Sequence, residues 1–250
     1  MRDMVQSQQT PHIVQQRGEV QVRALMHRFG AGRPVLDNLD LTIRAGEFVA
    51  LLGRSGSGKS TLLRMLAGLG QPTRGEVHVP SNKAVVFQES RLLPWMRVWQ
   101  NVALATLPEG KADRTRAERL LGEVGLSHRT DAWPLTLSGG EAQRVALSRA
   151  LVRDPDFIML DEPFGALDAL TRLQMQHLVL RLWARHACSI LLVTHDVDEA
   201  LLLADRVLVL QEGHIHMDVC IDIPRPRHHA DPDFEALRTT LLNALGVFVD

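Results

Sequence analysis

The chain has 250 residues, of which 45% are hydrophobic and 23% are charged, so it is long enough and apolar enough to bury one large core. Its 28 Lys and Arg are matched by 29 Asp and Glu, and this balance lacks the basic excess of a dedicated nucleic-acid binder. The two cysteines form neither a disulfide framework nor a zinc-binding spacing, and no stretch approaches the roughly 20 consecutive apolar residues that span a bilayer.

The first part of the chain alternates predicted strands with one clear helix. Residues 1–18 are polar and aperiodic, and we expect a flexible tail there. Residues 20–29 and 36–43 alternate as strands do, whereas residues 48–52 are a continuous apolar run typical of a buried parallel strand. A helix is predicted from Lys59 to about Gly68, followed by short strands over residues 75–79 and 84–87.

The remaining elements begin with a helical block, residues 96–136, that prolines and glycines interrupt. This block predicts a helical subdomain over about residues 89–153. Further helices are predicted over residues 138–153, 169–186, 196–204 and 232–245. Strands are predicted over residues 157–160 and 189–194, with a hairpin over residues 206–215 that turns at Glu212 and Gly213. Because strands alternate with helices, the sequence predicts an α/β fold with a mainly parallel sheet.

A glycine-rich loop follows the first buried strand. It reads Gly53-Arg54-Ser55-Gly56-Ser57-Gly58-Lys59-Ser60 and matches the pattern G-x-x-x-x-G-K-[ST]. Such a loop curls so that its N–H groups surround a phosphate, and the helix that follows adds partial positive charge. Lys59 can reach the β- and γ-phosphates, and the Ser60 hydroxyl can bind Mg²⁺. The four fixed positions occur by chance in on the order of 1% of chains of this length, so the pattern predicts a nucleotide site.

Two carboxylates end a later strand, and a serine with two glycines precedes it. Asp161 and Glu162 follow apolar residues 157–160, where a strand end faces the ligand crevice of a parallel sheet. Asp161 suits the Mg²⁺ coordination sphere, and Glu162 is placed to activate a water molecule as general base. An acidic pair alone would be a solvated strand end, but a P-loop in the same chain favours the catalytic interpretation. Ser138-Gly139-Gly140, at a predicted helix start, is a further candidate anion site, although such residues alone form a common N-cap.

The order of these motifs resembles the ATP-binding subunit of ABC transporters over about residues 19–218. The matching positions are Gly53 to Ser60, Gln88, Leu137 to Glu141, Asp161-Glu162, Asp168 and His195. The resemblance implies a P-loop NTPase core with a mainly parallel sheet, an antiparallel β subdomain from the N-terminal strands, and a helical subdomain that carries the signature residues 137–141. A C-terminal extension with a short helix, residues 219–250, would follow.

The resemblance also implies roles for individual residues. Glu162, His195 and Gln88 are the expected catalytic residues, with His195 bonded to the γ-phosphate and Gln88 sensing the metal and the attacking water. Phe29 takes the position of the aromatic residue that stacks on adenine, usually Tyr, and it keeps the π-face. Mg²⁺ would be held by Ser60, Gln88 and Asp161. The expected nucleotide-binding set is Phe29, Gly53, Arg54, Ser55, Gly56, Ser57, Gly58, Lys59, Ser60, Thr61, Ser138, Gly139, Gly140 and Asp168.

The resemblance implies partners and a location as well. Two copies would pack head to tail, so that each ATP lies between the P-loop of one copy and Ser138, Gly139 and Gly140 of the other. Transmembrane permease subunits and a periplasmic solute-binding protein would complete the complex, at the cytoplasmic face of the inner membrane and without nucleic acid. In the family, the region after Gln88 receives a helix of the permease, which makes Trp95 a candidate anchor; the alternative is a loop packed on its own subdomain.

The transported solute is predicted from resemblance alone. Leu92-Leu93-Pro94-Trp95 and residues 161–172 are similar to the nitrate, sulfonate and taurine branch of ABC importers, and residues 222–227 to the tail of aliphatic sulfonate importers. We therefore expect the ATPase of an aliphatic sulfonate importer, with taurine or nitrate import as the alternative. A soluble ABC-type ATPase acting on nucleic acid or ribosomes is the alternative of another class, but its members carry long insertions or two cassettes. An intact Glu162 disfavours a module without turnover.

Overall fold

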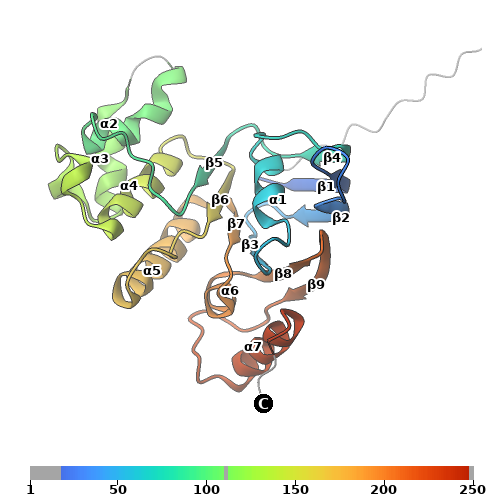
Figure 1. Ribbon diagram of the computed structural model, residues 1–250. Coiled ribbons are helices and arrows are strands. Elements are labelled where there is room, and N and C mark those ends of the chain that lie inside the picture. The colour runs from blue at the N-terminus through green and yellow to red at the C-terminus, as the bar shows by residue number, and fades with distance from the viewer. Residues whose placement is uncertain (1–17, 110–111, 248–250) are drawn as a thin grey trace, which may run out of the picture.

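Two β-sheets and two groups of helices make up the fold, as a computed structural model of residues 18–109 and 112–247 describes it (Figure 1). The expected tail, residues 1–18, lies outside the described residues except for Gly18. Gly18 is buried, and its carbonyl oxygen accepts a hydrogen bond of 2.7 Å from Ser189 Oγ.

The larger sheet has the strand order β5-β6-β7-β3-β8-β9. All neighbours are parallel except β8 and β9, which form an antiparallel hairpin. Every residue of β3 and β7 is buried, as the apolar runs predict for strands covered on both faces. The strands are β3 (Phe48–Leu52), β5 (Lys83–Val86), β6 (Phe157–Asp161), β7 (Ser189–Val193), β8 (Arg206–Gln211) and β9 (His214–Cys220).

The smaller sheet is antiparallel, with the order β2-β1-β4. It consists of β1 (Val20–His27), β2 (Leu36–Ile43) and β4 (Arg74–His78), so a strand that follows the first helix joins the two N-terminal strands. In β2 the apolar residues Leu39, Leu41 and Ile43 are buried and their neighbours are exposed. One apolar cluster joins this sheet to α1 (Lys59–Leu66) and to the larger sheet.

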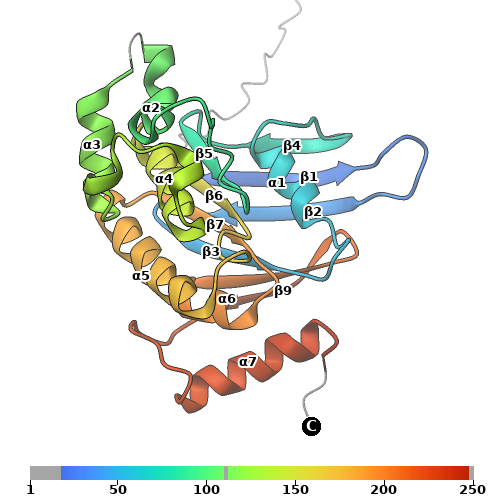
Figure 2. The ribbon, with the colours of Figure 1, turned by 60° about the vertical axis from the view of Figure 1, so that its left-hand side comes forward.

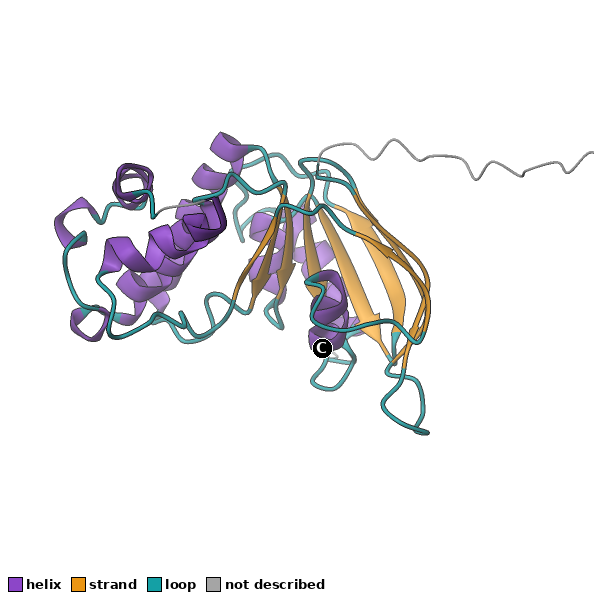
Figure 3. Cartoon of the chain, turned by 90° about the horizontal axis from the view of Figure 1, so that it is seen from above, coloured by secondary structure: helices purple, strands orange, loops and turns teal. Residues whose placement is uncertain are grey.

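Helices from the middle of the chain gather at one end of the molecule, away from the antiparallel strands (Figure 3). They are α2 (Val98–Ala103), α3 (Arg114–Glu123) and α4 (Gly139–Leu151), with 3₁₀ turns at Leu104–Glu109, Ser127–Arg129 and Pro134–Thr136. The remaining helices are α5 (Ala169–His186), α6 (Val197–Leu203) and α7 (Pro232–Ala244). In Figure 2, α7 lies beside α6 and β9 at the edge of the larger sheet. The fold is therefore the predicted α/β class, with parallel and antiparallel sheets.

The strand order brings distant motifs together. Strands β6, β7 and β3 are adjacent and parallel, so their C-terminal ends lie side by side. The glycine-rich loop leaves β3, the two carboxylates end β6, and His195 follows β7. Three segments more than 30 residues apart in the sequence therefore meet at one edge of the sheet.

Candidate nucleotide-binding site

The glycine-rich loop turns tightly between β3 and α1, and two of its glycines have no room for a side chain. A Cβ on Gly53 would lie 2.5 Å from Ser57 Oγ and 2.6 Å from the carbonyl oxygen of Leu210. Gly58, with φ of 109°, caps α1, and a Cβ there would lie 2.9 Å from Leu36 Cδ2 and from the carbonyl oxygen of Val35. The loop therefore needs glycine at both positions to bring its backbone N–H groups around the start of α1.

The Lys59 side chain folds back into this loop. Its ammonium Nζ donates to the carbonyl oxygens of Gly53 at 2.5 Å and Arg54 at 3.0 Å, and the residue is only 8% exposed. Burial lowers the pKa of Lys59, while the carboxylates of Glu162 and Asp161 oppose that shift. A buried cation that is satisfied only by carbonyl groups is suited to exchange them for an anionic ligand.

The carboxylates of Asp161 and Glu162 lie across from the loop. Glu162 has φ of 45°, a left-handed conformation that is uncommon for a non-glycine residue, and its N–H donates to the carbonyl oxygen of Val193 at 2.9 Å. Burial raises the pKa of Asp161, and the neighbouring Glu162 carboxylate raises it further, against the opposing charges of Arg91 and Lys59. His195 Nδ1 lies 3.4 Å from Glu162 Oε1. The arrangement is an acidic pair with an imidazole beside one member.

A cavity of about 320 Å³ lies between these groups. Eight predicted residues line it, six of them from the glycine-rich loop and the start of α1 and the other two Glu162 and His195, so the structure brings these eight to one place. Its lining residues are Val35, Ser55, Gly56, Gly58, Lys59, Ser60, Thr61, Glu162 and His195. Val35 was missed by sequence reasoning, since an apolar residue before a strand gives no signal of a ligand site.

Gln88 lies outside the cavity lining, at the beginning of the segment that follows β5. A Cβ on Gly165 would lie 3.0 Å from Gln88 Nε2, which places the glutamine against the turn after Glu162. The next residues are held by Arg149 of α4, which donates to the carbonyl oxygens of Ser90 at 2.7 Å and Arg91 at 2.9 Å. Segments 88–91 and 161–165 thus pack together.

Arg91 is a second residue that the sequence analysis did not place at the site. Its guanidinium lies 3.7 Å from the centre of the Phe87 ring, and its charge acts on the pKa of Asp161. The cation is therefore close enough to Asp161 to favour the ionised form of that carboxyl. An arginine in a surface loop has no sequence signal that distinguishes this position from a solvated one.

Other predicted residues lie outside the cavity. Ser138 and Gly139 are exposed at the start of α4, where Ser138 Oγ accepts from Glu141 N at 3.2 Å, and Gly140 is buried against Thr171. Asp168 caps α5, with its carboxylate accepting from Thr171 N at 3.0 Å. Phe29 is 63% exposed. Among the described residues, the cavity lining includes none of these predicted contacts, so one chain does not enclose the whole predicted set.

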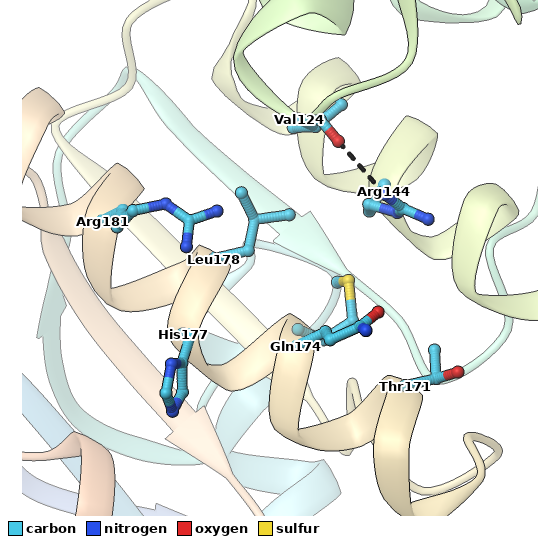
Figure 4. Close-up of a pocket in the computed structure, with 8 residues that line it drawn as sticks. Val124, Arg144, Thr171, Gln174, His177, Leu178 and Arg181 are labelled. Atoms are coloured by element: carbon cyan, nitrogen blue, oxygen red, sulfur yellow. Dashed lines mark hydrogen bonds between the residues drawn. The ribbon is translucent and has the colours of Figure 1, made fainter.

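A second cavity, of about 310 Å³, separates the α4 group of helices from α5 (Figure 4). Thr171, Gln174, Leu178 and Arg181 follow one side of α5, opposite Arg144 of α4, whose Nη1 donates to the carbonyl oxygen of Val124 at 3.4 Å. The two helices pack against each other near their N-terminal ends, at Gly140 and Thr171. A Cβ on Gly140 would lie 2.5 Å from Thr171 Cγ2.

Within residues 18–109 and 112–247, no group of three or more His, Cys, Asp or Glu side chains is arranged to hold a metal ion. In the same part of the chain, every helix is too short or too polar to traverse a bilayer.

Comparison with known proteins gives a consistent result. The family model described as ABC transporter matches residues 36–165. An aliphatic sulfonates import ATP-binding protein of Paracoccus denitrificans is 63% identical, over 91% of this chain and 92% of that protein. Proteins with the same description from Pseudomonas fluorescens and Streptomyces avermitilis are 62% and 60% identical, over 92% and 91% of this chain and 88% and 86% of theirs.

Solved structures are similar in fold. A protein of Clostridium perfringens, described as part of an ABC transporter complex, superposes with a TM-score of 0.74 at 27% identity, over 80% of this chain and 87% of that one. An ATP-binding cassette solved as a dimer in a post-hydrolysis state, bound to ADP and phosphate, superposes with a TM-score of 0.72 at 30% identity, over 82% of this chain and 100% of that one.

Proposed function

The chain belongs to the ABC transporter family, and from this premise we propose that it is the ATP-hydrolysing subunit of an importer of aliphatic sulfonates. The observation that carries the ATPase assignment is the single cavity that the P-loop shares with Glu162 and His195. A phosphate chain bound by the loop would present its terminal phosphate to a carboxylate and an imidazole. The reaction is ATP and water to ADP and phosphate.

Each residue at the cavity has a distinct part in this reaction. Glu162 accepts a proton from the attacking water through a carboxylate oxygen, and His195 Nδ1, 3.4 Å away, lies where its ring can contact the terminal phosphate. Lys59 exchanges its bonds to the carbonyls of Gly53 and Arg54 for bonds to phosphate oxygens. Phe29, exposed at the end of β1, stacks on the adenine.

The residues present also fit a Mg²⁺ ion bound together with the nucleotide. Ser60 lines the cavity, and Asp161 is a carboxylate beside Glu162 whose pKa is raised first by burial and then by the Glu162 charge, so a cation would stabilise its ionised form. We assign Ser60, Gln88 and Asp161 to hold the ion. When bound, it neutralises charge on the β- and γ-phosphates.

A second copy of the chain is needed to complete the site. Ser138 and Gly139 are exposed at the start of α4 and lie outside the cavity of their own chain, which supports their use by a partner copy. In a head-to-tail dimer the N-terminus of α4 in one copy faces the P-loop of the other. Asp168, exposed at the start of α5, is assigned to the same contact.

The remaining assignments concern organisation and location. We assign residues 19–218 to the ATPase domain, with the helical subdomain at about residues 89–153, residues 1–18 to a tail and residues 219–250 to a C-terminal extension. Transmembrane permease subunits bind the Gln88–Trp95 region, where Trp95 is exposed, and a periplasmic solute-binding protein delivers the solute. The subunit is thus peripheral, at the cytoplasmic face of the inner membrane.

The sulfonate assignment follows the relatives, which are named as aliphatic sulfonate importers at about 60% identity over nine-tenths of the chain. Taurine or nitrate import is the second candidate, because no residue of this subunit contacts the solute. A soluble ATPase that acts on nucleic acid is the candidate of another class, and the absence of basic excess in the sequence disfavours it.

The assignment is tested in a strain that lacks this gene. It should fail to grow with an alkanesulfonate as sole sulfur source and grow normally on sulfate, and the wild-type gene should restore growth whereas Glu162→Gln should not. If the strain failed to grow only on taurine or only on nitrate, the solute assignment would change to that compound, and the ATPase assignment would stay in place. Normal growth on every one of these sources, with no second importer present, would contradict importer function.

A further inference from the structure

The segment after β9 packs on the helix that follows His195. Residues 221–227 return across the C-terminal end of α6, with Ile221 N donating to the carbonyl oxygen of Asp205 at 2.9 Å. Ile221 and Ile223 join the main apolar core. Figure 2 shows α7, which comes next, lying along the same side of the molecule as α6. This region contains the arginines of residues 222–227, which the ATPase assignment leaves without a role.

Two of these arginines hold the end of α6. The last carbonyl groups of a helix have no partner within the helix, and a cation beside them is favourable. Arg227 is buried and donates to four carbonyl oxygens, those of Leu201 and Ala204 at the end of α6 and those of Ile221 and Ile223 in its own segment. Arg225 donates to the carbonyl oxygen of Leu203 and pairs with Asp205.

A third arginine holds the beginning of the same helix. Arg238 of α7 donates from Nε to Asp198 Oδ1 at 2.8 Å, in the first turn of α6. That turn is cross-linked by Asp196, whose Oδ1 accepts from the N–H groups of Asp198 and Glu199. The Thr194 hydroxyl donates to Glu199 Oε2 at 2.7 Å and accepts from Asp196 N at 3.1 Å. The backbone of His195 therefore belongs to a hydrogen-bonded cluster, residues 194–199, that Arg238 contacts from α7, while the imidazole itself is 67% exposed.

The end of the segment also reaches the phosphate loop. Arg54 Nη2 donates to the carbonyl oxygen of Gly246 at 3.4 Å, and a cavity of about 490 Å³ lies between the end of α7 and residues 54–57. The segment thus contacts both the loop that would hold the phosphates and the helix behind His195.

We propose that residues 221–246 form a C-terminal clamp whose arginines Arg225, Arg227 and Arg238 are positioning residues for His195. The clamp fixes α6 at both ends, and α6 fixes the backbone from which His195 reaches toward Glu162. None of the three arginines lines the phosphate cavity, within the part of the chain that the structure describes, so they act through α6. The proposal rests on the proposed ATPase function, in which His195 contacts the terminal phosphate.

Arg238→Ala in the full-length chain is the test, because Arg238 is only half-buried and bonds to none of the carbonyl groups that Arg227 holds. Glu235→Ala is the matched control: it removes the second partner of Arg238, at 3.3 Å on the same helix, without touching α6. At saturating ATP and Mg²⁺ we expect Arg238→Ala to lower kcat about threefold to tenfold, with KM for ATP changed less than about twofold and the control unaffected.

A double-mutant cycle separates positioning from general damage. In a His195→Ala background, Arg238→Ala should lower kcat no further, because the residue it positions is gone. An equal loss of kcat in both backgrounds would overturn the proposal, and so would an unchanged kcat in the wild-type background. In either case, a loss of kcat caused by His195→Ala alone would still support the ATPase assignment.

A readout that needs no turnover completes the test. The imidazole NMR resonances of His195 should shift in Arg238→Ala and stay in place in Glu235→Ala, whether or not the chain hydrolyses ATP. Unmoved resonances would overturn the positioning role even if kcat fell. A chain that hydrolyses no ATP but shows the shift would instead contradict the proposed function and leave the clamp in place.

Discussion

At the scale of single residues, the site depends on the positions of the Glu162 carboxylate and the Lys59 ammonium group. Glu162 has a left-handed backbone, its N–H donates to the carbonyl oxygen of Val193, and its carboxylate lies 3.4 Å from His195 Nδ1. Lys59 lies under the loop with its ammonium bonded to two carbonyls. One residue would act on water and the other on phosphate, so their loss should have different effects.

Glu162→Gln should bind ATP and fail to hydrolyse it, because the amide cannot accept the proton of water. We expect phosphate release to fall by about 10²- to 10⁴-fold, and an ATP-bound dimer to accumulate on gel filtration. Glu76→Gln, at an exposed position of β4, is the control. Hydrolysis at the wild-type rate would show that another group is the base.

Lys59→Ala should weaken nucleotide binding itself, since it removes the charge that would face the phosphates. The affinity for ATP, measured by calorimetry in the presence of Mg²⁺, should drop at least about tenfold. An unchanged affinity would mean that the ammonium stays bonded to Gly53 and Arg54 when the nucleotide binds.

At the scale of elements, the loop after Gln88 connects the site to the molecular surface. Arg149 holds its backbone at residues 90 and 91, the charge of Arg91 lowers the pKa of Asp161, and Trp95 is 71% exposed beyond them. The anchored and exposed parts of one loop are therefore only a few residues apart. A partner docked at the exposed part would therefore lie only a few residues from Arg91, whose charge acts on the pKa of Asp161.

Trp95→Ala should uncouple transport and leave the basal ATPase of the isolated subunit within about twofold of wild type, since an exposed aromatic anchor acts in binding a partner. Growth on an alkanesulfonate and co-purification of the permease are the measurements. Leu69→Ala, an exposed apolar residue after α1, is the control. An equal fall in basal ATPase would make Trp95 a structural residue.

The start of α4 has a capping box formed by Ser138 and Glu141, and the contribution of Glu141 to stability depends on pH. Backbone bonding to Ser138 lowers the pKa of Glu141, and Arg129 lowers it further. A lowered carboxyl pKa contributes stability above the ordinary Glu value of about 4.3, and that contribution is lost as the pH falls through the lowered value.

Glu141→Gln should keep the capping box and lose the ion pair with Arg129. In urea unfolding it should be about 0.5 to 1 kcal/mol less stable at pH 7, with the difference shrinking below pH of about 4. ATPase activity should be unchanged. If the difference in unfolding free energy between the wild type and this variant did not depend on pH, the charge of Glu141 would contribute nothing to stability.

Patterning predicts most of these elements, and the misses have physical reasons. The apolar runs of β3, β6 and β7 predict buried strands within one or two residues. The predicted hairpin ended at Ile215, whereas β9 runs to Cys220, because an edge strand with alternating exposure is weakly apolar. Val35, Arg91 and the arginines of the clamp were missed because each acts through tertiary contacts that no local pattern encodes.

At the scale of the whole molecule, the proposed site is divided between two copies. The P-loop cavity and the exposed start of α4 belong to different surfaces of one chain. Gly139 offers a clean way to test this, since a Cβ there would meet no atom within 4 Å. Gly139→Asp should therefore fold, because an acid in the first turn of a helix is favourable, yet repel a phosphate.

Mixing Lys59→Ala with Gly139→Asp should restore activity that neither variant has alone. In a mixed dimer, one of the two sites combines an intact Lys59 with an intact Gly139, which gives about a quarter of wild-type ATPase for random pairing. Gly139→Ala is the control for size without charge. A mixture no more active than its components would indicate that the motif acts within its own chain.

The tryptophans, which dominate the intrinsic fluorescence, are unevenly distributed over the molecule. The chain has four Trp and no Tyr, so its near-ultraviolet emission comes from Trp95, Trp99, Trp133 and Trp183 alone. Trp95 belongs to the region that would receive the permease and is open to water, and Trp99 and Trp133 follow it in the helical subdomain, where their rings lie under arginine guanidinium groups. Trp183 is instead tied to the core through a bond to Gly46. Intrinsic fluorescence therefore reports mainly on Trp95 and the helical subdomain beside it. A collisional quencher would lose access to Trp95 when a permease covers the Gln88–Trp95 region.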